Sequence, residues 1–370
     1  MNWMDTVPLW DHHCHLIVGR KRADDMKSFA YALSEAPESY PLADIQETVV
    51  YWRALAVAAR ELGTEVDATM VQHALKDRDF SDYASRLLHQ AGYNKLLVDT
   101  GFVPPGACTL KEMEALLTMS ISPIFRIERA AEAVFSQFDS VGDWIHFLKG
   151  SLKALRAEGY VGVKSIVAYR SGLNIAQVRH EDAQAAFECM KRRGQNRLTD
   201  ASLLNYLLWE LAPILIEETL PIQFHTGYGD RDMDLSQGNP LLLRNFLETF
   251  TPHGLKVLLL HTYPYHREAG YLASVYPAVY FDVSLALPLA ASGSRRIVAE
   301  ALELAPASRF LFASDAHSRP ESFALAAQLW RESLKKYCEY LVTEHHLLPQ
   351  VVEKWVEMMA WQNCRRVYQI

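Results

Sequence analysis

Short apolar segments recur along the chain, and each is followed by a longer stretch whose apolar residues have helical spacing. Segments with two apolar faces are typical of parallel strands that are buried on both sides. The pattern predicts eight such strands: Pro8–Asp11, Lys95–Asp99, Pro123–Ile127, Val161–Ile166, Pro221–Phe224, Lys256–Leu260, Val279–Val283 and Arg309–Ala313. Eight parallel strands that alternate with helices predict an α/β fold of the (β/α)8 type, the TIM barrel.

The stretches between these strands predict the helices of such a barrel. The clearest helical patterns cover Asp143–Ala157, Leu198–Glu218, Leu241–Phe250, Ser294–Leu304, Glu321–Leu341 and Val351–Val367. Asp143 is a suitable N-cap for the first of them, and Asn239 before Pro240 is suitable for the third. The last is expected to be a C-terminal helix that packs on the outside of the barrel.

The gap between the first and second predicted strands is too long for one helical crossover. It contains two helix-like stretches, Asp44–Leu62 and Asp67–Gly92. We therefore predict a helical insertion at about residues 20–92, within a single domain that spans residues 1–370. An insertion at this point lies above the C-terminal ends of the strands, where it either shapes the active site or makes contacts between subunits.

The composition excludes several classes of protein. Half of the 370 residues are hydrophobic and 22% are charged, which fits a large buried core and argues against disorder. The net charge of -7, with no basic stripe, argues against nucleic acid as a partner. No apolar run approaches the about 20 residues of a membrane span, and the N-terminus lacks a secretory pattern. We therefore expect a cytoplasmic protein without a membrane partner, whose cysteines are free thiols because they form no C-x-x-C pair.

The first predicted strand ends in a cluster of histidines. Asp11 is followed by His12, His13, Cys14 and His15. Because residues i and i+2 of a strand point to the same side, His13 and His15 are expected to project together and His12 to face away. Two imidazoles on one side form half of a metal site.

Three further predicted strands end in residues that bind metals. His225 follows the fifth strand, His261 the sixth and Asp315 the eighth. The C-terminal ends of barrel strands converge around one axis, so these side chains are expected to meet the histidines of the first strand. We predict a site for one or two divalent metal ions. Zn²⁺ is expected from the imidazole and carboxylate ligands, whose preferences overlap with those for Mn²⁺ and Fe²⁺.

This order of ligands resembles the amidohydrolase superfamily, and within it the amidohydrolase-2 group of metal-dependent hydrolases. In that group H-x-H ends strand one, single histidines end strands five and six, and aspartate ends strand eight. The residues that match in order are His13, His15, His225, His261 and Asp315. The stretches Gly162–Ile166, Phe224–Asp230 and His261–Gly270 are similar to the amidohydrolase-like half of nodulin/glutamine-synthetase-like proteins.

The resemblance implies that a metal-activated water attacks a carbonyl carbon. Asp315 is the expected general base, because a carboxylate beside the metal can pass a proton from the water to the leaving group. His261 or His225 would polarise the carbonyl oxygen. The alternative is that Asp315 is a ligand only, in which case its change to asparagine weakens metal occupancy rather than turnover at full occupancy.

Lys164, in the fourth predicted strand, has three alternative roles. Some branches of the family carboxylate a strand-four lysine, which then bridges two metal ions. Lys164 would otherwise remain an ammonium that binds an anionic substrate, or have a purely structural role. The first role requires two metals, and the second requires one.

Further residues near the predicted strand ends are candidates for binding a small-molecule substrate. They are Arg126, Arg170, Tyr228 and Arg267, together with Lys164. Arginine suits carboxylates because its planar fork makes paired hydrogen bonds, although each of these residues could also be a solvated surface group.

The expected reaction is hydrolysis of a C–N bond of the amide, cyclic amide or γ-glutamyl type, or of an ester. The alternative is a metal-dependent, non-oxidative decarboxylation of an aromatic or unsaturated acid, since the resembling family includes such enzymes with nearly the same ligands. A non-catalytic sensor or scaffold is a third reading, although a degraded site would then be expected. We also expect a homo-oligomer.

Overall fold

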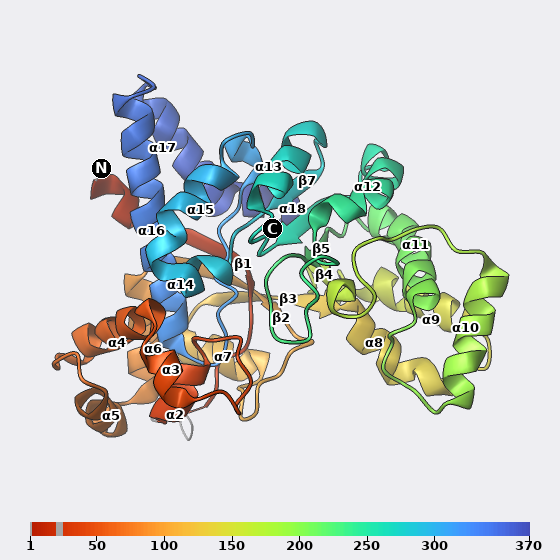
Figure 1. Ribbon diagram of the computed structural model, residues 1–370, viewed down its shortest axis with the longest axis horizontal. Helices are drawn as coiled ribbons and strands as arrows, with labels where there is room; N and C mark the ends of the chain where they lie inside the picture. Colours follow the sequence, from red (N-terminus) through yellow and green to blue (C-terminus); the bar gives the residue numbers. More distant parts are fainter. Residues whose placement is uncertain (1, 20–24) are drawn as a thin grey trace.

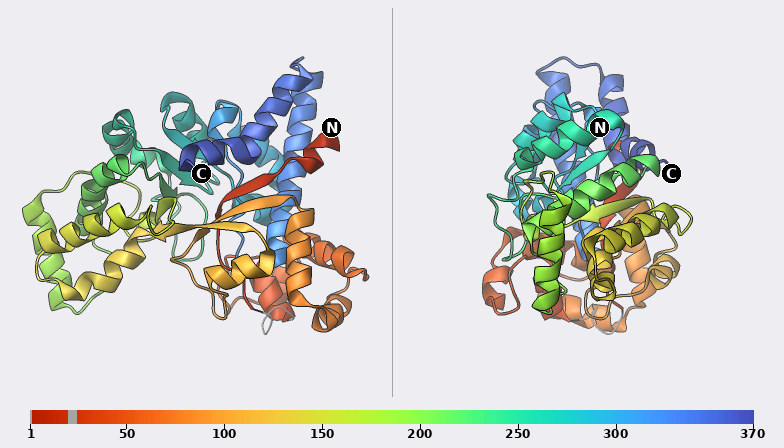
Figure 2. Two further views of the ribbon diagram at one scale, coloured as in Figure 1. Left: turned by 180° about the vertical axis from the view of Figure 1, so that it is seen from behind. Right: turned by 90° about the vertical axis from the view of Figure 1, so that its right-hand side faces the viewer.

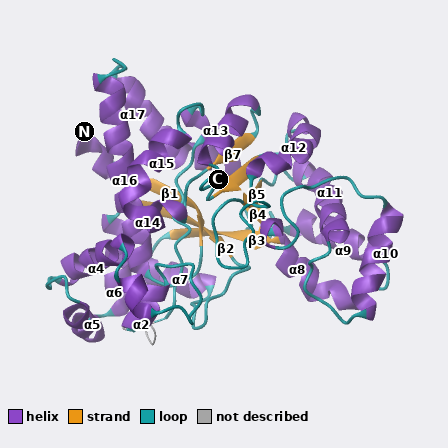
Figure 3. Cartoon of the chain, in the orientation of Figure 1, coloured by secondary structure: helices purple, strands orange, loops and turns teal. Residues whose placement is uncertain are grey.

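The structure, a computed structural model, describes residues 2–19 and 25–370. Within these residues a parallel sheet of seven strands runs in the order β1 to β7 (Figure 3). The strands are Leu9–Cys14, Tyr93–Asp99, Ser120–Arg126, Gly162–Ser165, Ile222–His225, Val257–Leu260 and Val279–Phe281. They confirm the first seven predicted strands to within a few residues. Because all the pairings are parallel, the C-terminal ends of the strands share one rim of the curved sheet.

The eighth predicted strand, Arg309–Ala313, is not a regular strand. Phe310 makes an isolated parallel bridge with Phe281 of β7. On the other side of the segment, the carbonyl of Phe312 accepts a hydrogen bond of 3.2 Å from the backbone N–H of His12 in β1. The segment therefore joins the two edges of the sheet and closes the barrel, but it makes too few ladder hydrogen bonds to form a strand.

The long connection between β1 and β2 is helical, as predicted. Its helices are α2 (Met26–Tyr31), α3 (Leu42–Gln46), α4 (Val49–Leu62), α5 (Ala68–Asp77) and α6 (Phe80–Gln90), in the red to orange part of Figure 1. The side chains of Thr48, Asp67 and Asp79 cap α4, α5 and α6 by accepting backbone N–H bonds in the first turn. Residues 20–24 of the predicted insertion lie outside the described residues.

A second helical group stands on the opposite side of the sheet (Figure 1). It consists of α8 (Ile127–Val134) and α9 (Val141–Ala154) after β3, and of α10 (His180–Arg192) and α11 (Ala201–Glu217) after β4. Phe135, Trp144 and Phe187 form its aromatic core, with ring centroids 4.6–5.9 Å apart. The predicted N-cap of α9 is wrong: Ser140 caps it, and its hydroxyl accepts the backbone N–H of Asp143 at 3.1 Å.

One of the remaining helices follows β2, and the others follow β5 or later elements. They are α7 (Leu110–Leu117) after β2, α12 (Arg244–Phe250), α13 (His266–Val275), α14 (Ala286–Ala290), α15 (Ser294–Ala301), α16 (Pro320–Thr343), α17 (Pro349–Glu357) and α18 (Asn363–Tyr368). A 3-10 turn, Pro240–Leu243, precedes α12, and the side chain of Asn239 caps it as expected. None of the helices in the described part of the chain combines the length and the apolar character that crossing a bilayer requires.

The predicted C-terminal helix is divided, and its end does not pack on the outside of the barrel. A π-helical turn, Met358–Gln362, separates α17 from α18 (Figure 2, left). Val367 and Tyr368 of α18 join a buried cluster with interior residues of the strands, among them Leu97 and Leu258. Lys256, which precedes β6, donates to the Val367 carbonyl at 3.1 Å, so α18 closes the N-terminal end of the barrel. The sequence pattern could not reveal this, because a helix that plugs a barrel is as apolar as one that packs outside it.

Candidate metal centre and substrate cavity

Hydrogen bonds inside the barrel join the histidines of β1 to its floor. The ring of His12 lies 3.1 Å from the hydroxyl of Tyr368 and 2.9 Å from the carboxylate of Asp282. The side chain of Gln223 donates to Tyr368 at 2.7 Å and accepts from Nδ1 of His13 at 2.9 Å. His12 and His13 therefore belong to one network, and the prediction that His12 faces away is wrong. The pairing of β1 with β2 is irregular over its last residues, and such a bulge interrupts the alternation of side chains.

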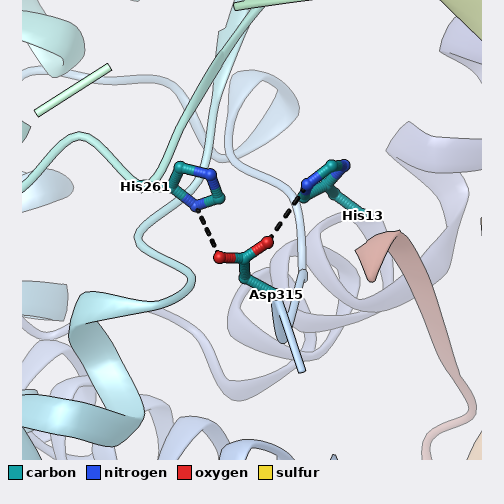
Figure 4. A group of neighbouring side chains, drawn as sticks. All are labelled: His13, His261 and Asp315. Atoms are coloured by element: carbon teal, nitrogen blue, oxygen red, sulfur yellow. Dashed lines mark ion pairs between the residues drawn. The ribbon is translucent and has the colours of Figure 1, made fainter. Parts of the chain in front are cut away.

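Asp315 lies among three of the predicted histidines. Its Oδ1 is 3.1 Å from Nε2 of His13, and its Oδ2 is 3.7 Å from Nδ1 of His261 (Figure 4). The same Oδ1 is 3.1 Å from Nε2 of His15. The backbone N–H of Asp315 donates to the carbonyl of His13 at 3.0 Å. Both Asp315 and His261 have positive φ angles, of 53° and 70°. Such conformations are costly for residues other than glycine, and they concentrate at functional sites.

The two single histidines lie beside each other. The rings of His225 and His261 have centroids 4.4 Å apart, and the ring of Tyr169 lies 4.4 Å from that of His225 on another side. His225 is oriented by the carbonyl of Tyr228, 3.0 Å from its Nε2, and His261 by the hydroxyl of Ser284, 2.8 Å from its Nδ1. The structure thus brings all five predicted ligands to one end of the barrel.

These residues fit a divalent cation. Ligand atoms of His13, His261 and Asp315 lie within 4.8 Å of one another, as do those of His13, His15 and Asp99. Nε2 of His261 and Nδ1 of His15 are buried and have no hydrogen-bond partner in the described part of the chain. Buried nitrogens are usually paired, so these are available to a ligand.

The protonation of the site also suits a cation. Burial lowers the pKa of His13 to about 4 and holds the pKa values of His225 and His261 well below the usual range. Their rings are therefore neutral at pH 7, as metal binding requires. Burial would raise the pKa of Asp315, but His261 and the hydrogen bonds from His13 and His15 hold it well below the usual value, so this carboxylate is charged.

Asp99 is a residue of this site that the sequence analysis missed. It ends β2, is fully buried and accepts a hydrogen bond of 3.0 Å from Nε of Arg126. Burial would raise the pKa of Asp99, but the charge of Arg126 holds it well below the usual range. The signal was present in the sequence, because Asp99 directly follows an apolar strand in the same way as the predicted ligands do.

Lys164 projects from β4 into the same cluster. Its Nζ lies 3.0 Å from Nε2 of His13, and its side chain is buried. Burial lowers the pKa of Lys164 to about 8, against the opposing charges of Asp99 and Asp315. A lysine with this pKa is partly neutral near pH 7, and both the amine and the ammonium forms are therefore accessible.

A cavity of about 220 Å³ opens directly over these residues. Its lining comes from both helical groups and from the strand ends: His15, Glu35, Phe102, Arg126, Lys164, Ile166, Tyr169, Arg170, Arg197, His225, Asp230, Asp232, His261, Leu285, Asp315 and His317. A larger cavity of about 400 Å³ between α4, α6 and α16 has neither histidine nor cysteine in its lining. We place the candidate site in the smaller cavity because the imidazoles and carboxylates converge there.

The predicted substrate-binding residues divide into two groups. Arg126, Lys164 and Arg170 line the cavity. Tyr228 is not among the lining residues, and its backbone carbonyl orients His225 instead. Arg267 is 57% exposed on α13 and forms ion pairs with glutamates at its surface, so the expectation that it contacts the substrate is not supported. The sequence could not separate these arginines, since each follows a strand end by a few residues.

Arg170 is the least satisfied cation of the cavity wall. Its Nη2 lies 3.4 Å from the carboxylate of Glu132, while its Nε and Nη1 are buried without a hydrogen-bond partner among the described residues. Arg126 differs, because its guanidinium is already paired with Asp99. An arginine with free donors in a cavity wall is suited to an anionic group of a ligand.

Comparison with known proteins connects this site to a family. Residues 169–370 match a family model described as amidohydrolase. The matched range contains the strand ends that carry His225, His261 and Asp315, whereas β1 precedes it.

Solved structures share the architecture over the full length of the chain. A protein from Lactobacillus casei ATCC 334, provisionally assigned as a metal-dependent hydrolase, is 40% identical, with a TM-score of 0.93 over 100% of this chain and 96% of that chain. A uronate isomerase from Thermotoga maritima is 14% identical, with a TM-score of 0.70 over 99% of this chain and 96% of its own. At that identity the second likeness shows a common fold alone.

A curated relative is longer than this chain. Protein fluG from Emericella nidulans is 27% identical over 407 residues, which cover 99% of this chain and 46% of that protein. The chain therefore spans less than half the length of this relative.

Proposed function

Since this chain belongs to the amidohydrolase family, we propose that it hydrolyses a C–N bond, of the amide, cyclic amide or γ-glutamyl type, or an ester bond of a small substrate that bears a carboxylate. One observation carries the proposal. Nitrogen atoms of His13 and His15 and the carboxylate of Asp315 converge below a cavity into which His261 also opens, and His261 keeps an unpaired nitrogen there.

We propose that a divalent metal, Zn²⁺ by the chemistry of its ligands, is held by His13, His15, His225, His261 and Asp315. A metal bound there would supply Lewis acidity, which polarises a carbonyl group and lowers the pKa of water to about 7. Lys164 would either join the ligands in a carboxylated form, with a second metal, or remain a cation that faces the substrate.

The side chains of the protein would then handle the proton. Asp315 is ionised and open to the cavity, so its carboxylate oxygen can accept the proton of the attacking water and return it to the leaving nitrogen. His261 is neutral and is held by Ser284 at Nδ1, which leaves Nε2 to face the reacting group. The geometry of both residues is fixed before the substrate arrives, which reduces the cost of orienting them.

The substrate's carboxylate is proposed to bind at Arg170. Two guanidinium nitrogens of Arg170 have no acceptor in the described structure, and each unpaired buried donor costs about 1–3 kcal/mol. A carboxylate could accept a charge-assisted hydrogen bond from Nε or from Nη1, which lie on different edges of the planar guanidinium group. We further propose a cytoplasmic homo-oligomer, which a solution mass measurement and cell fractionation would test.

A substrate screen on the metal-loaded protein tests the reaction. γ-Glutamyl amides, N-acyl amino acids and lactones would be offered together with aromatic acids, and both amine or acid release and CO₂ release would be measured. Hydrolysis of an amide or ester is the expected outcome. Release of CO₂ without uptake of water would instead identify a decarboxylase, which the same cluster of ligands could support.

A further inference from the structure

The helical connection after β1 contributes one acidic side chain to the cavity. Glu35 lies between α2 and α3, far in sequence from every strand end, and it lines the cavity together with Asp315 and Asp230. It also lines a small adjoining void of about 30 Å³ that contains Asp315 and His317. The side chain of Glu35 makes no hydrogen bond or ion pair in the part of the chain that the structure describes. His261 also lines this cavity, and its Nε2 is buried without a hydrogen-bond partner among the described residues.

The charges of the cavity are separated into two poles. Burial raises the pKa of Glu35 to about 8, and the charges that add to this effect are those of Asp315 and Asp230, both negative. At Arg170 burial lowers the pKa, the charge of Glu132 raises it, and the charges of Arg197 and Arg126 lower it again; three arginines therefore line this second pole, with Glu132 beside them. With a pKa of about 8, Glu35 is mostly protonated near pH 7, and an ammonium bound beside it would favour its carboxylate form, which a purely anionic ligand would not do.

The aromatic ring of Tyr169 borders the acidic pole. Burial raises the pKa values of the Tyr169 and Tyr228 hydroxyls, and the charge of Glu35 contributes to both shifts. Tyr169 lies between the poles, since its ring packs on His225 and its hydroxyl accepts the backbone N–H of Asp230 at 3.3 Å. Carboxylates beside aromatic rings form a favourable environment for an ammonium group.

We propose that Glu35 binds a protonated amine of the substrate, so that the substrate is a zwitterion of the amino-acid type with its carboxylate at Arg170. This inference rests on the proposed function, because it assumes that the substrate occupies the same cavity. It assigns to the helices between β1 and β2 a role in selecting the substrate. A bound ammonium would supply a positive charge beside Glu35, where residues 2–19 and 25–370 place none.

Binding of matched small molecules tests the inference without requiring turnover. L-Glutamate and L-glutamine would be compared by calorimetry with glutarate and glutaramate, which have the same carbon chain but lack the amine. The metal-loaded wild-type protein is expected to bind at least one amino acid about tenfold more tightly than its counterpart, as for a hydrogen bond between charged groups. Glu35→Gln should reduce this ratio to near one while leaving the affinity of the counterpart unchanged.

Glu38→Gln is the matched control, because Glu38 lies in the same connection but is exposed and does not line the cavity. This variant should keep the wild-type preference. The inference is overturned if no amino acid binds more tightly than its counterpart, including the case in which none binds, or if Glu35→Gln leaves the ratio unchanged. Hydrolysis of neutral or purely anionic amides with no preference for an amine would sink this inference alone and leave the proposed reaction intact.

Discussion

The two ends of the barrel use polar side chains in opposite ways. At the floor, the side chains of His12, Gln223 and Tyr368 are paired with one another, and Asp282 completes the group. At the mouth, nitrogens of His15, His261 and Arg170 are buried without a partner among the described residues. The same strands supply both layers: Gln223 and His225 are separated by one residue in β5. Polar groups that satisfy each other stabilise the fold, whereas groups left unpaired are available for a ligand.

The largest expected effect is a loss of activity from a variant at the mouth, one that leaves the floor unchanged. Asp315→Asn should lower kcat by about 10²- to 10⁴-fold, because the general base is lost while the shape of the side chain is kept. Steady-state kinetics on protein with measured metal content would check this. If activity returns fully once the metal site is saturated, Asp315 is a ligand only.

Metal bound at the mouth should stabilise the folded protein. At a free Zn²⁺ concentration of about 100 times its Kd, the free energy of unfolding should rise by about 2.7 kcal/mol, and a chelator should reverse the gain. Thermal unfolding with and without Zn²⁺ measures it. His261→Ala should reduce the gain, whereas the matched surface variant His253→Ala should keep it, since His253 lies on the turn after α12. An equal gain in both variants would argue against His261 as a ligand.

A variant at the floor should lose stability and keep its activity. Tyr368→Phe removes the hydroxyl that accepts from Gln223 and contacts His12, and the free energy of unfolding should fall by about 1–3 kcal/mol because buried groups lose their partner. At temperatures where the variant is folded, kcat should stay within about threefold of wild type. Denaturant unfolding and kinetics together test this, and a loss of activity without a loss of stability would contradict the division between floor and mouth.

The smallest expected effect is a difference in KM between variants of two arginines. Arg170→Gln should raise KM for a carboxylate-bearing substrate about tenfold, because a charged hydrogen bond is lost. Arg267→Gln should change KM by less than about twofold, since its ion pairs are largely exposed. Equal effects on KM would show that the unpaired donors of Arg170 do not meet the substrate.

The parts of the barrel differ also in how well the sequence predicted them. Apolar segments located seven strands, and the residues that follow apolar segments located His225, His261 and Asp315, because strand ends in a parallel barrel share one rim. The bulge of β1 was not predictable, since alternation is the only rule that a short strand provides. Glu35 was missed for a different reason: it reaches the cavity through the packing of a long connection, which leaves no local pattern in the sequence.

The irregular segment that replaces the eighth strand has a consequence for assembly. Phe312 of this segment accepts the backbone N–H of His12 at the edge of β1 that faces away from β2, and Asp315 follows two residues after the segment. The histidines of β1 therefore meet the carboxylate of Asp315 only after the roughly 300 residues between them have been synthesised. Contacts this distant in sequence form late and slowly, so a nascent chain halted before this segment would hold most of the helices and no functional centre.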